Sequence, residues 1–131
     1  MSGPVQRPDA PPEFFDTAGW RVKVSSPAAS PLQIGQVLEI QFPTFTPRIT
    51  FHSERELTVE IIGGDNRGFS DTVEYEAVAV RDGLVLLSWQ EHIGTTVVHL
   101  LDLNSGTAYT AVTPAKGAFM RLTGIIDRLD S

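Results

Sequence analysis

The sequence predicts an all-β fold, an eight-stranded antiparallel up-and-down β-barrel. Residues 84–113 (LVLLSWQEHIGTTVVHLLDLNSGTAYTAVT) form three runs rich in apolar and β-branched residues, joined by two glycine-bearing turns, which is the pattern of a β-meander. From residue 35 onward the chain reads as eight short strands with short connections and hardly any helix. Closing such a sheet into a barrel removes the exposed edges that would promote aggregation. A β-sandwich is the alternative.

Each predicted strand is bounded by turn residues. The first three strands are predicted at residues 36–42, 48–53 and 56–62, and the third ends at the loop 63–68 (GGDNRG) because glycine, aspartate and asparagine favour turns. The fourth strand, residues 70–80, is followed by Asp82-Gly83, a tight-hairpin signal. The remaining strands are predicted at residues 84–91, 95–103, 107–113 and 118–128, the last after a turn at 114–117.

The turn between the strands at 84–91 and 95–103 decides which side chains face the interior. His92-Ile93-Gly94 fits a three-residue hairpin loop with glycine in the left-handed conformation, and this loop would set Leu87 opposite His99. A two-residue loop, Ile93-Gly94, would instead turn His99 outward. With the longer loop, alternation predicts an inner face of Val85, Leu87, Trp89, Glu91, Thr95, Val97, His99 and Leu101.

Length and composition bound the class of protein. At 131 residues the chain is long enough for one domain with a single core. Its net charge of −6 argues against nucleic acid and anionic membranes as partners. Because it has no cysteine, it has neither a disulfide framework nor a thiolate metal site. No apolar run reaches membrane-spanning length, and the N-terminus lacks the apolar core of a signal peptide, so we expect a cytoplasmic protein.

The first 34 residues differ from the rest of the chain. Residues 1–12 contain four of the nine prolines and no periodic pattern, so we expect a disordered or extended arm. Residues 13–34 include Phe14, Phe15 and Trp20, which are unfavourable in water, so we expect this segment to pack on or cap the barrel. The barrel domain is then expected over residues 35–131.

Part of the barrel region resembles a known family. Residues 75–122 contain the pieces YEAVAV, LSWQEHIGTTVVHLLDL, GTAYTAVT and AFMRLTG. These pieces resemble the MoaF-like proteins, named for molybdenum-cofactor biosynthesis protein F, and the resemblance extends more loosely back to Gly35. It implies a barrel of the lipocalin, or calycin, type, in agreement with the strand pattern.

A more distant resemblance concerns the centre of the same region. LSWQEHIGTTV is similar to the SW-x-E-P-x-GT-x-V segment of bacterial phenolic acid decarboxylases, which share the barrel. Those enzymes use the glutamate of that segment, an arginine in a glycine-rich loop and two tyrosines of the first strand. The resemblance places the glutamate at Glu91, the arginine at Arg67 and the tyrosines near Ile40 and Phe42. The sequence therefore lacks both tyrosines, and it has His92 where that segment has proline.

Four side chains are candidates for catalysis: Glu91, Arg67, His99 and Tyr109. Inside an apolar barrel, Glu91 would have a raised pKa and could exchange protons near neutral pH. Arg67 could bind a substrate carboxylate, and His99 could be a second proton-transfer group. Tyr109 could supply a hydroxyl in place of the missing tyrosines. Each also has a structural interpretation. Glu91 would be a surface carboxylate and Arg67 a solvated arginine, while His99 would be a hydrogen-bonded core histidine and Tyr109 a packed tyrosine.

We expect the interior to bind one small hydrophobic or aromatic molecule that could carry a carboxylate. Trp89 and Tyr75 would provide flat walls. The other ligand-binding candidates are Thr95, Val97, Phe42, Ile40 and Thr113. The three histidines, His52, His92 and His99, have no recognisable metal-binding spacing, so we expect no metal, and no cofactor is implied.

Lipocalin-like barrels serve both as carriers and as enzymes, so three hypotheses remain open. The first hypothesis is a cofactor-independent acid–base enzyme of decarboxylase, isomerase or cyclase type in a biosynthetic pathway. The second is a non-catalytic carrier. The third hypothesis is a structural or assembly protein whose barrel is filled by side chains. The sequence does not fix the oligomeric state, although barrels of this kind often pair as homodimers through an outer sheet face.

Overall fold

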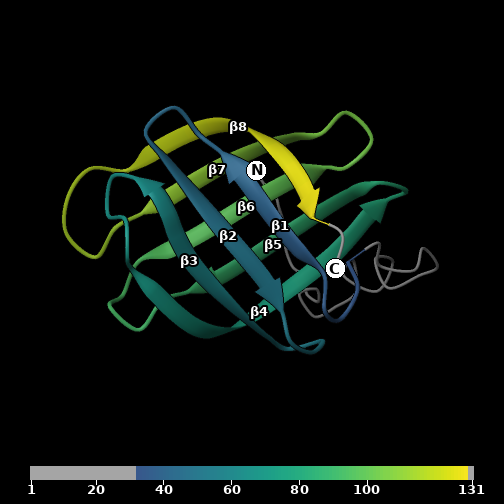
Figure 1. The fold of residues 1–131 in the computed structure, drawn as a ribbon, viewed down its shortest axis with the longest axis horizontal. Helices are drawn as coiled ribbons and strands as arrows, with labels where there is room; N and C mark the ends of the chain where they lie inside the picture. The colour runs from purple at the N-terminus through teal and green to yellow at the C-terminus, as the bar shows by residue number, and fades with distance from the viewer. Residues whose placement is uncertain (1–31, 130–131) are drawn as a thin grey trace, which may run out of the picture.

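A computed structural model describes residues 32–129, which form a closed barrel of eight antiparallel strands (Figure 1). In chain order the strands are β1 (Val37–Gln41), β2 (Phe45–Phe51), β3 (Glu56–Gly64), β4 (Ser70–Arg81), β5 (Leu84–Gln90), β6 (Thr96–Asp102), β7 (Thr107–Thr113) and β8 (Met120–Leu129). Each strand pairs with its neighbours in the chain, and β1 pairs with β8 to close the ring. The predicted barrel is confirmed, and a sandwich is excluded because it would leave sheet edges unpaired.

The expected arm, residues 1–12, and all of the expected capping segment except residues 32–34 lie outside the described residues. Just before β1, the backbone N–H of Gly35 donates to the carbonyl of Phe51 at 2.7 Å, which attaches the start of the described chain to β2. Over residues 32–129 no helix has the length and apolarity needed to cross a membrane.

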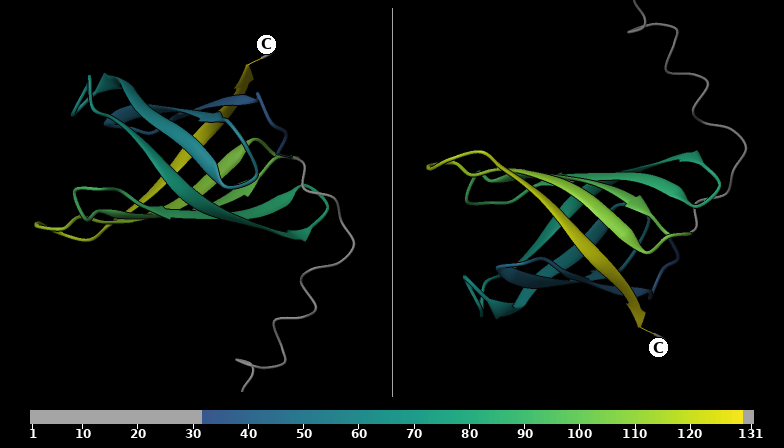
Figure 2. Two further views of the ribbon diagram at one scale, coloured as in Figure 1. Left: turned by 90° about the horizontal axis from the view of Figure 1, so that it is seen from below. Right: turned by 90° about the horizontal axis from the view of Figure 1, so that it is seen from above.

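Two long strands, β4 and β8, connect the two sides of the barrel. Figure 2 shows β1–β3 over one side and β5–β7 over the other, with β4 and β8 running between them. β4 has 12 residues and β8 has 10, whereas β5, β6 and β7 have 7 each. The twist of these long strands carries the sheet around, so that a single sheet closes on itself.

β2 begins three residues before its predicted start because the strand tolerates a proline. Pro47 has no backbone N–H to give to the sheet, and the pairing of β2 with β3 shifts between Thr46 and Pro47. This β-bulge lets the strand continue across the proline back to Phe45, which lies opposite Gly64. The same pairing extends β3 two residues beyond its predicted end, into the glycines of the following loop.

The β5–β6 hairpin has the predicted three-residue loop. The backbone N–H of Glu91 donates to the carbonyl of Thr95 at 2.8 Å, and that of Gly94 donates to the carbonyl of Glu91 at 2.8 Å. Gly94 has a φ of 98°, a left-handed conformation that residues with a side chain rarely adopt. This loop sets Leu87 opposite His99, and both side chains are buried. His99 therefore faces inward, as predicted, and the two-residue loop is excluded.

The interior is filled at one end of the barrel and hollow at the other. The filled end lies beside the β2–β3, β4–β5 and β6–β7 turns. The largest side chains that are less than 2% exposed lie from the middle of the barrel to this end: Phe51, Leu38, Ile40, Ile49, Leu57, Leu87, Leu101 and Val85. Because these aliphatic and aromatic side chains come from five strands, burying them holds those strands together.

Gly124 lies on β8 in close contact with β1. A Cβ atom at this position would lie 2.8 Å from side-chain atoms of Ile40 and Phe42 and 2.9 Å from the backbone oxygen of Gln41. That oxygen cannot move without disturbing the β1–β8 pairing that closes the barrel. Only glycine therefore fits at this contact without separating the two strands.

Replacing Gly124 with alanine should destabilise the protein, because β1 and β8 must separate to admit the methyl group. We expect the free energy of unfolding to fall by about 1–3 kcal/mol, measured by denaturant unfolding followed by circular dichroism. Gly63→Ala is the matched control, because a Cβ atom there would meet only the Cβ of Thr46, at 3.9 Å. Equal losses of stability in the two variants would contradict the close approach of β8 to β1.

Candidate functional site

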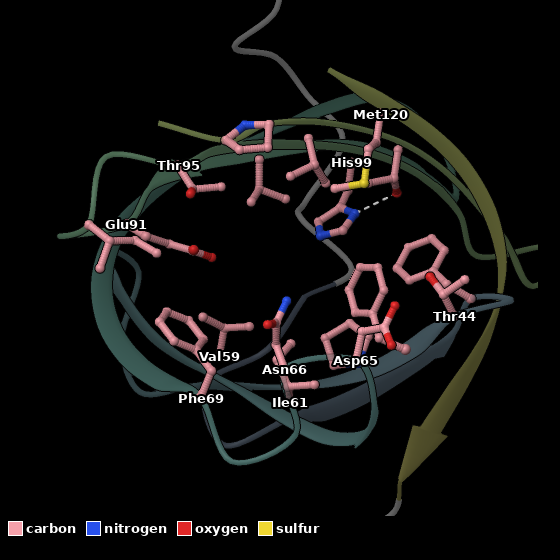
Figure 3. A pocket seen from close by; sticks show the side chains of 18 of the residues that line it. Thr44, Val59, Ile61, Asp65, Asn66, Phe69, Glu91, Thr95, His99 and Met120 are labelled. Carbon is pink, nitrogen blue, oxygen red and sulfur yellow. Dashed lines mark hydrogen bonds between the residues drawn. The ribbon is translucent and has the colours of Figure 1, made fainter. Parts of the chain in front are cut away.

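A cavity occupies the end of the barrel at which the β1–β2, β3–β4, β5–β6 and β7–β8 loops lie (Figure 3). Its volume is about 370 Å³, within the range of small-molecule sites. Most of its wall is apolar, and four aromatic side chains line it: Phe42, Phe45, Phe69 and Trp89. The hypothesis of a barrel filled by side chains throughout is therefore wrong.

Glu91 follows β5, and its carboxylate points into the cavity (Figure 3). The indole Nε1–H of Trp89 donates a hydrogen bond to Oε2 of Glu91 at 3.1 Å. Burial raises the pKa of Glu91, the indole hydrogen bond opposes this rise, and the nearby carboxylate of Asp71 adds to it. The direction of this shift in pKa agrees with the expectation, and Glu91 is half-buried at the cavity rather than fully exposed on the surface.

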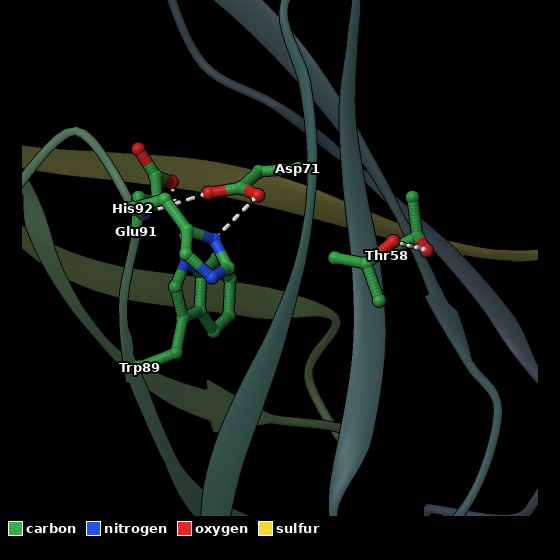
Figure 4. Close-up of polar contacts among 6 residues, drawn as sticks. Thr58, Asp71, Trp89, Glu91 and His92 are labelled. Atoms are coloured by element: carbon green, nitrogen blue, oxygen red, sulfur yellow. Dashed lines mark hydrogen bonds and ion pairs between the residues drawn. The ribbon is translucent and has the colours of Figure 1, made fainter.

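Asp71 on β4 holds the β5–β6 loop in place (Figure 4). One of its carboxylate oxygens accepts a hydrogen bond from the backbone N–H of His92 at 2.8 Å, and the other lies 2.8 Å from Nδ1 of the same residue. Burial raises the pKa of Asp71, and the contacts with His92 lower it. The contacts with His92 have the larger combined effect, so the pKa of Asp71 lies below its ordinary value. Asp71 therefore fixes the loop beside Glu91 and places a negative charge there.

His99 on β6 is 2% exposed and faces the cavity. Its Nδ1 lies 2.7 Å from Oγ1 of Thr110 on β7. The ring is flanked by Trp89, whose centroid is 5.1 Å away, and by Phe42, which is nearly parallel to it at 6.3 Å. Burial lowers the pKa of His99 to about 3, so the imidazole is neutral at neutral pH. Its ring nitrogens then offer one N–H donor and one lone pair.

Two of the four catalytic candidates do not reach the cavity. Arg67 is exposed in the β3–β4 loop and is not among the lining residues, so it does not provide the expected anchor for a carboxylate. Tyr109 is 51% exposed on the outside of β7. Its neighbours Ala108 and Thr110 take the inward positions, and side chains alternate along a strand. The hydroxyl expected from Tyr109 is therefore absent from the cavity.

Four of the ligand-binding candidates line the cavity: Trp89, Thr95, Val97 and Phe42. The other three do not. Ile40 is completely buried in the core, and Thr113 is exposed on the outside of β7. The hydroxyl of Tyr75 donates to the carbonyl of Ser53 at 2.7 Å, and its ring packs edge-on against Phe51. Tyr75 is therefore a core residue whose hydroxyl is already satisfied.

Four further polar residues line the cavity, and the sequence patterns do not mark them as site residues: Thr44, Asp65, Asn66 and Thr110. Asp65 and Asn66 belong to the GGDNRG loop, in which Arg67 alone is predicted as a site residue. Among the described residues that line the cavity, Asp65 and Glu91 are the charged side chains, and none is lysine or arginine. Within residues 32–129 there is no group of three or more histidine, cysteine, aspartate or glutamate side chains that could hold a metal ion.

The chain is similar to known proteins over most of its barrel. A family profile described as MoaF-like matches residues 34–127, which is more than half of the chain. A crystal structure from Burkholderia vietnamiensis, described as that of a candidate beta-lactamase, has a similar fold with a TM-score of 0.72. The two sequences are 28% identical, and the match covers 78% of this chain and 100% of the other. No curated protein matches the chain.

Replacing Glu91 with glutamine should change how stability depends on pH. Because the folded-state pKa of Glu91 is raised, its contribution to stability is present at low pH and is lost as the pH rises through that pKa. The glutamine variant has no charge to bury, so it should be more stable than the wild type at neutral pH. The difference should vanish below the ordinary glutamate pKa of about 4.3.

Thermal unfolding measured across this pH range tests the expectation. Glu74→Gln is the matched control, because Glu74 lies exposed on the outer face of β4. A gain of the same size and pH dependence in the control would show that the effect does not come from burial of Glu91.

Proposed function

The chain belongs to the MoaF-like family, and we propose that its barrel binds one small, largely apolar or aromatic molecule in the cavity at the open end. The observation that carries this proposal is the hollow of about 370 Å³, which adjoins a densely filled core. A hollow of this size with apolar walls is the usual form of a small-molecule site. The four aromatic side chains of its wall favour a ligand with a flat ring.

A second candidate function, acid–base catalysis without a cofactor, is favoured by the environment of Glu91. A carboxyl group with a raised pKa is a better general base or acid near neutral pH than an exposed one. Glu91 would take a proton from one atom of the bound molecule and return it to another. His99 would provide a neutral hydrogen-bonding group, because its lowered pKa keeps it uncharged. These two residues support an isomerase-type proton shift.

Decarboxylation is less well supported than isomerisation. A substrate carboxylate needs a positive partner when it leaves water, and the expected partner, Arg67, does not line the cavity. The similar structure from Burkholderia vietnamiensis is described as that of a candidate beta-lactamase. Within residues 32–129, the lining contains no serine, cysteine or lysine of the kind that nucleophilic hydrolysis of a lactam employs.

Ligand binding can be followed through Trp89, which lies in the cavity wall. The chain has a second tryptophan, Trp20, so the titration should be made in a Trp20→Phe background. We expect saturable quenching of the fluorescence of Trp89 by a small aromatic probe such as 2-acetylnaphthalene, because the probe's ring would contact the indole. The measurement is a fluorescence titration, with the dissociation constant checked by calorimetry.

A matched pair of variants separates cavity binding from adsorption to the surface. Val97→Phe would fill the cavity, because Val97 is 5% exposed and lines it, and we expect at least about tenfold weaker binding. Val98→Phe adds the same group to the outer face, where Val98 is 41% exposed, and should leave binding unchanged. Equal effects of the two substitutions would contradict binding in the cavity.

The catalytic candidate is tested by proton exchange, which does not require the natural substrate. An aromatic ketone with acidic C–H bonds, such as 2-tetralone, should exchange deuterium from D₂O faster when the protein is present. Glu91→Gln should lower the protein-dependent rate by about 10²-fold or more while binding persists. Nuclear magnetic resonance of the probe measures the exchange. Exchange that is unaffected in Glu91→Gln would remove Glu91 from the chemistry and leave the binding function in place.

A further inference from the structure

We propose that the ligand is an uncharged, mainly apolar ring compound whose carbonyl-type oxygen accepts a hydrogen bond from Nε2–H of His99. The inference rests on the proposed binding function and specifies the chemical class of the molecule bound. It depends on two features of the cavity: a buried ring nitrogen that has no hydrogen-bond partner within residues 32–129, and a lining that, over the same residues, contains no lysine or arginine.

The contact with Thr110 determines which nitrogen of His99 carries the proton. If the Thr110 hydroxyl donates to Nδ1, the proton of the neutral ring lies on Nε2, and the one unsatisfied donor faces the cavity. If Nδ1–H donates instead, the hydroxyl hydrogen of Thr110 needs an acceptor, and none is found in the described part of the chain. That arrangement would leave two buried polar groups unsatisfied, so the first is favoured.

The free nitrogen of His99 points into the cavity. In Figure 3 one ring nitrogen of His99 meets Thr110, and the other faces the space toward which Glu91 points. The ring cannot turn freely, because it is flanked by Trp89 and by the nearly parallel Phe42. An N–H group that is buried and held in this way is stabilised when a ligand oxygen takes the place of the missing partner.

The charges of the wall select against an anionic ligand. The charged lining residues, Asp65 and Glu91, are acidic, and a third carboxylate, that of Asp71, lies near Glu91. A carboxylate ligand would leave water without a positive partner and would meet these acidic groups. A ketone, lactone or quinone carries the acceptor that His99 needs without that penalty. The rest of such a molecule would contact the aromatic wall.

Four naphthalene probes of similar size test the assignment on the full-length protein. They are 2-acetylnaphthalene, 2-isopropylnaphthalene, 2-naphthoate and 1-(2-naphthyl)ethylammonium, and their dissociation constants are measured by calorimetry. We expect the naphthoate to bind at least about tenfold more weakly than the ketone. Tighter binding of either the naphthoate or the ammonium probe than of the ketone would overturn the assignment of an uncharged ligand.

Variants of His99 and Thr110 test the hydrogen bond. The ratio of the dissociation constants of the isopropyl and acetyl probes should fall by about tenfold from the wild type to His99→Phe. Because each ratio compares two ligands on one protein, a general loss of stability cancels. Thr110→Val should also lower this ratio, because without the Thr110 hydroxyl the ring proton of His99 is no longer held on Nε2 and can move to Nδ1. Thr113→Val is the control. Thr113 is exposed on the outside of the same strand, so its substitution should leave the ratio unchanged.

The tautomer itself can be read independently of binding. Long-range ¹H–¹⁵N spectra distinguish the two neutral forms of an imidazole, and the chain has three histidines, so His99 can be assigned by substitution. We expect the proton on Nε2. A proton on Nδ1, or an unchanged probe ratio in His99→Phe, would overturn this inference and leave the proposed binding function intact. If no probe binds the wild type, the binding function fails as well.

Discussion

The register of the β5–β6 hairpin is the constraint on which the site depends. Its three-residue loop, closed by Gly94 in the left-handed conformation, sets Leu87 opposite His99. A slip of one residue would turn every side chain of β6 to the other face, so that His99 would leave the cavity. Asp71 reinforces the register from β4, because it binds both the backbone and the ring of His92. The barrel thus positions its candidate chemistry by backbone pairing and one carboxylate from a neighbouring strand.

Burial shifts both titratable groups that face each other across the cavity toward their uncharged forms. It raises the pKa of Glu91 and lowers that of His99 to about 3, and the same loss of hydration explains both directions. A cavity of this kind suits neutral molecules and proton transfer better than it suits binding of ions. The position of Arg67 in the exposed loop has the same consequence, because the part of the lining that the structure describes then has no cation to balance a bound anion.

The parts of the structure that local patterns encode could be predicted from the sequence. Alternation of apolar residues and the turn dipeptide Asp82-Gly83 were sufficient for the strands and their order. The features that differ from the prediction depend on pairing between strands. The bulge at Pro47 lets β2 begin earlier than predicted, and the register of β7 places Tyr109 on the outer face. The contact of Asp71 with His92 joins residues 21 positions apart, and no local signal marks it. Pairs of this kind require the closed barrel before they can be recognised.

The division of the interior into a filled and a hollow half has a consequence for how such barrels diverge. Residues such as Phe51 and Leu57 keep the sheet closed without contacting the cavity. Residues at the open end, such as Ile93 and Met120, contribute to the cavity wall while 61% and 38% exposed, respectively. Selection can therefore alter the lining of the mouth while the folding core stays unchanged. A lineage built on this plan can acquire new ligands through substitutions that leave the protein stable enough to fold.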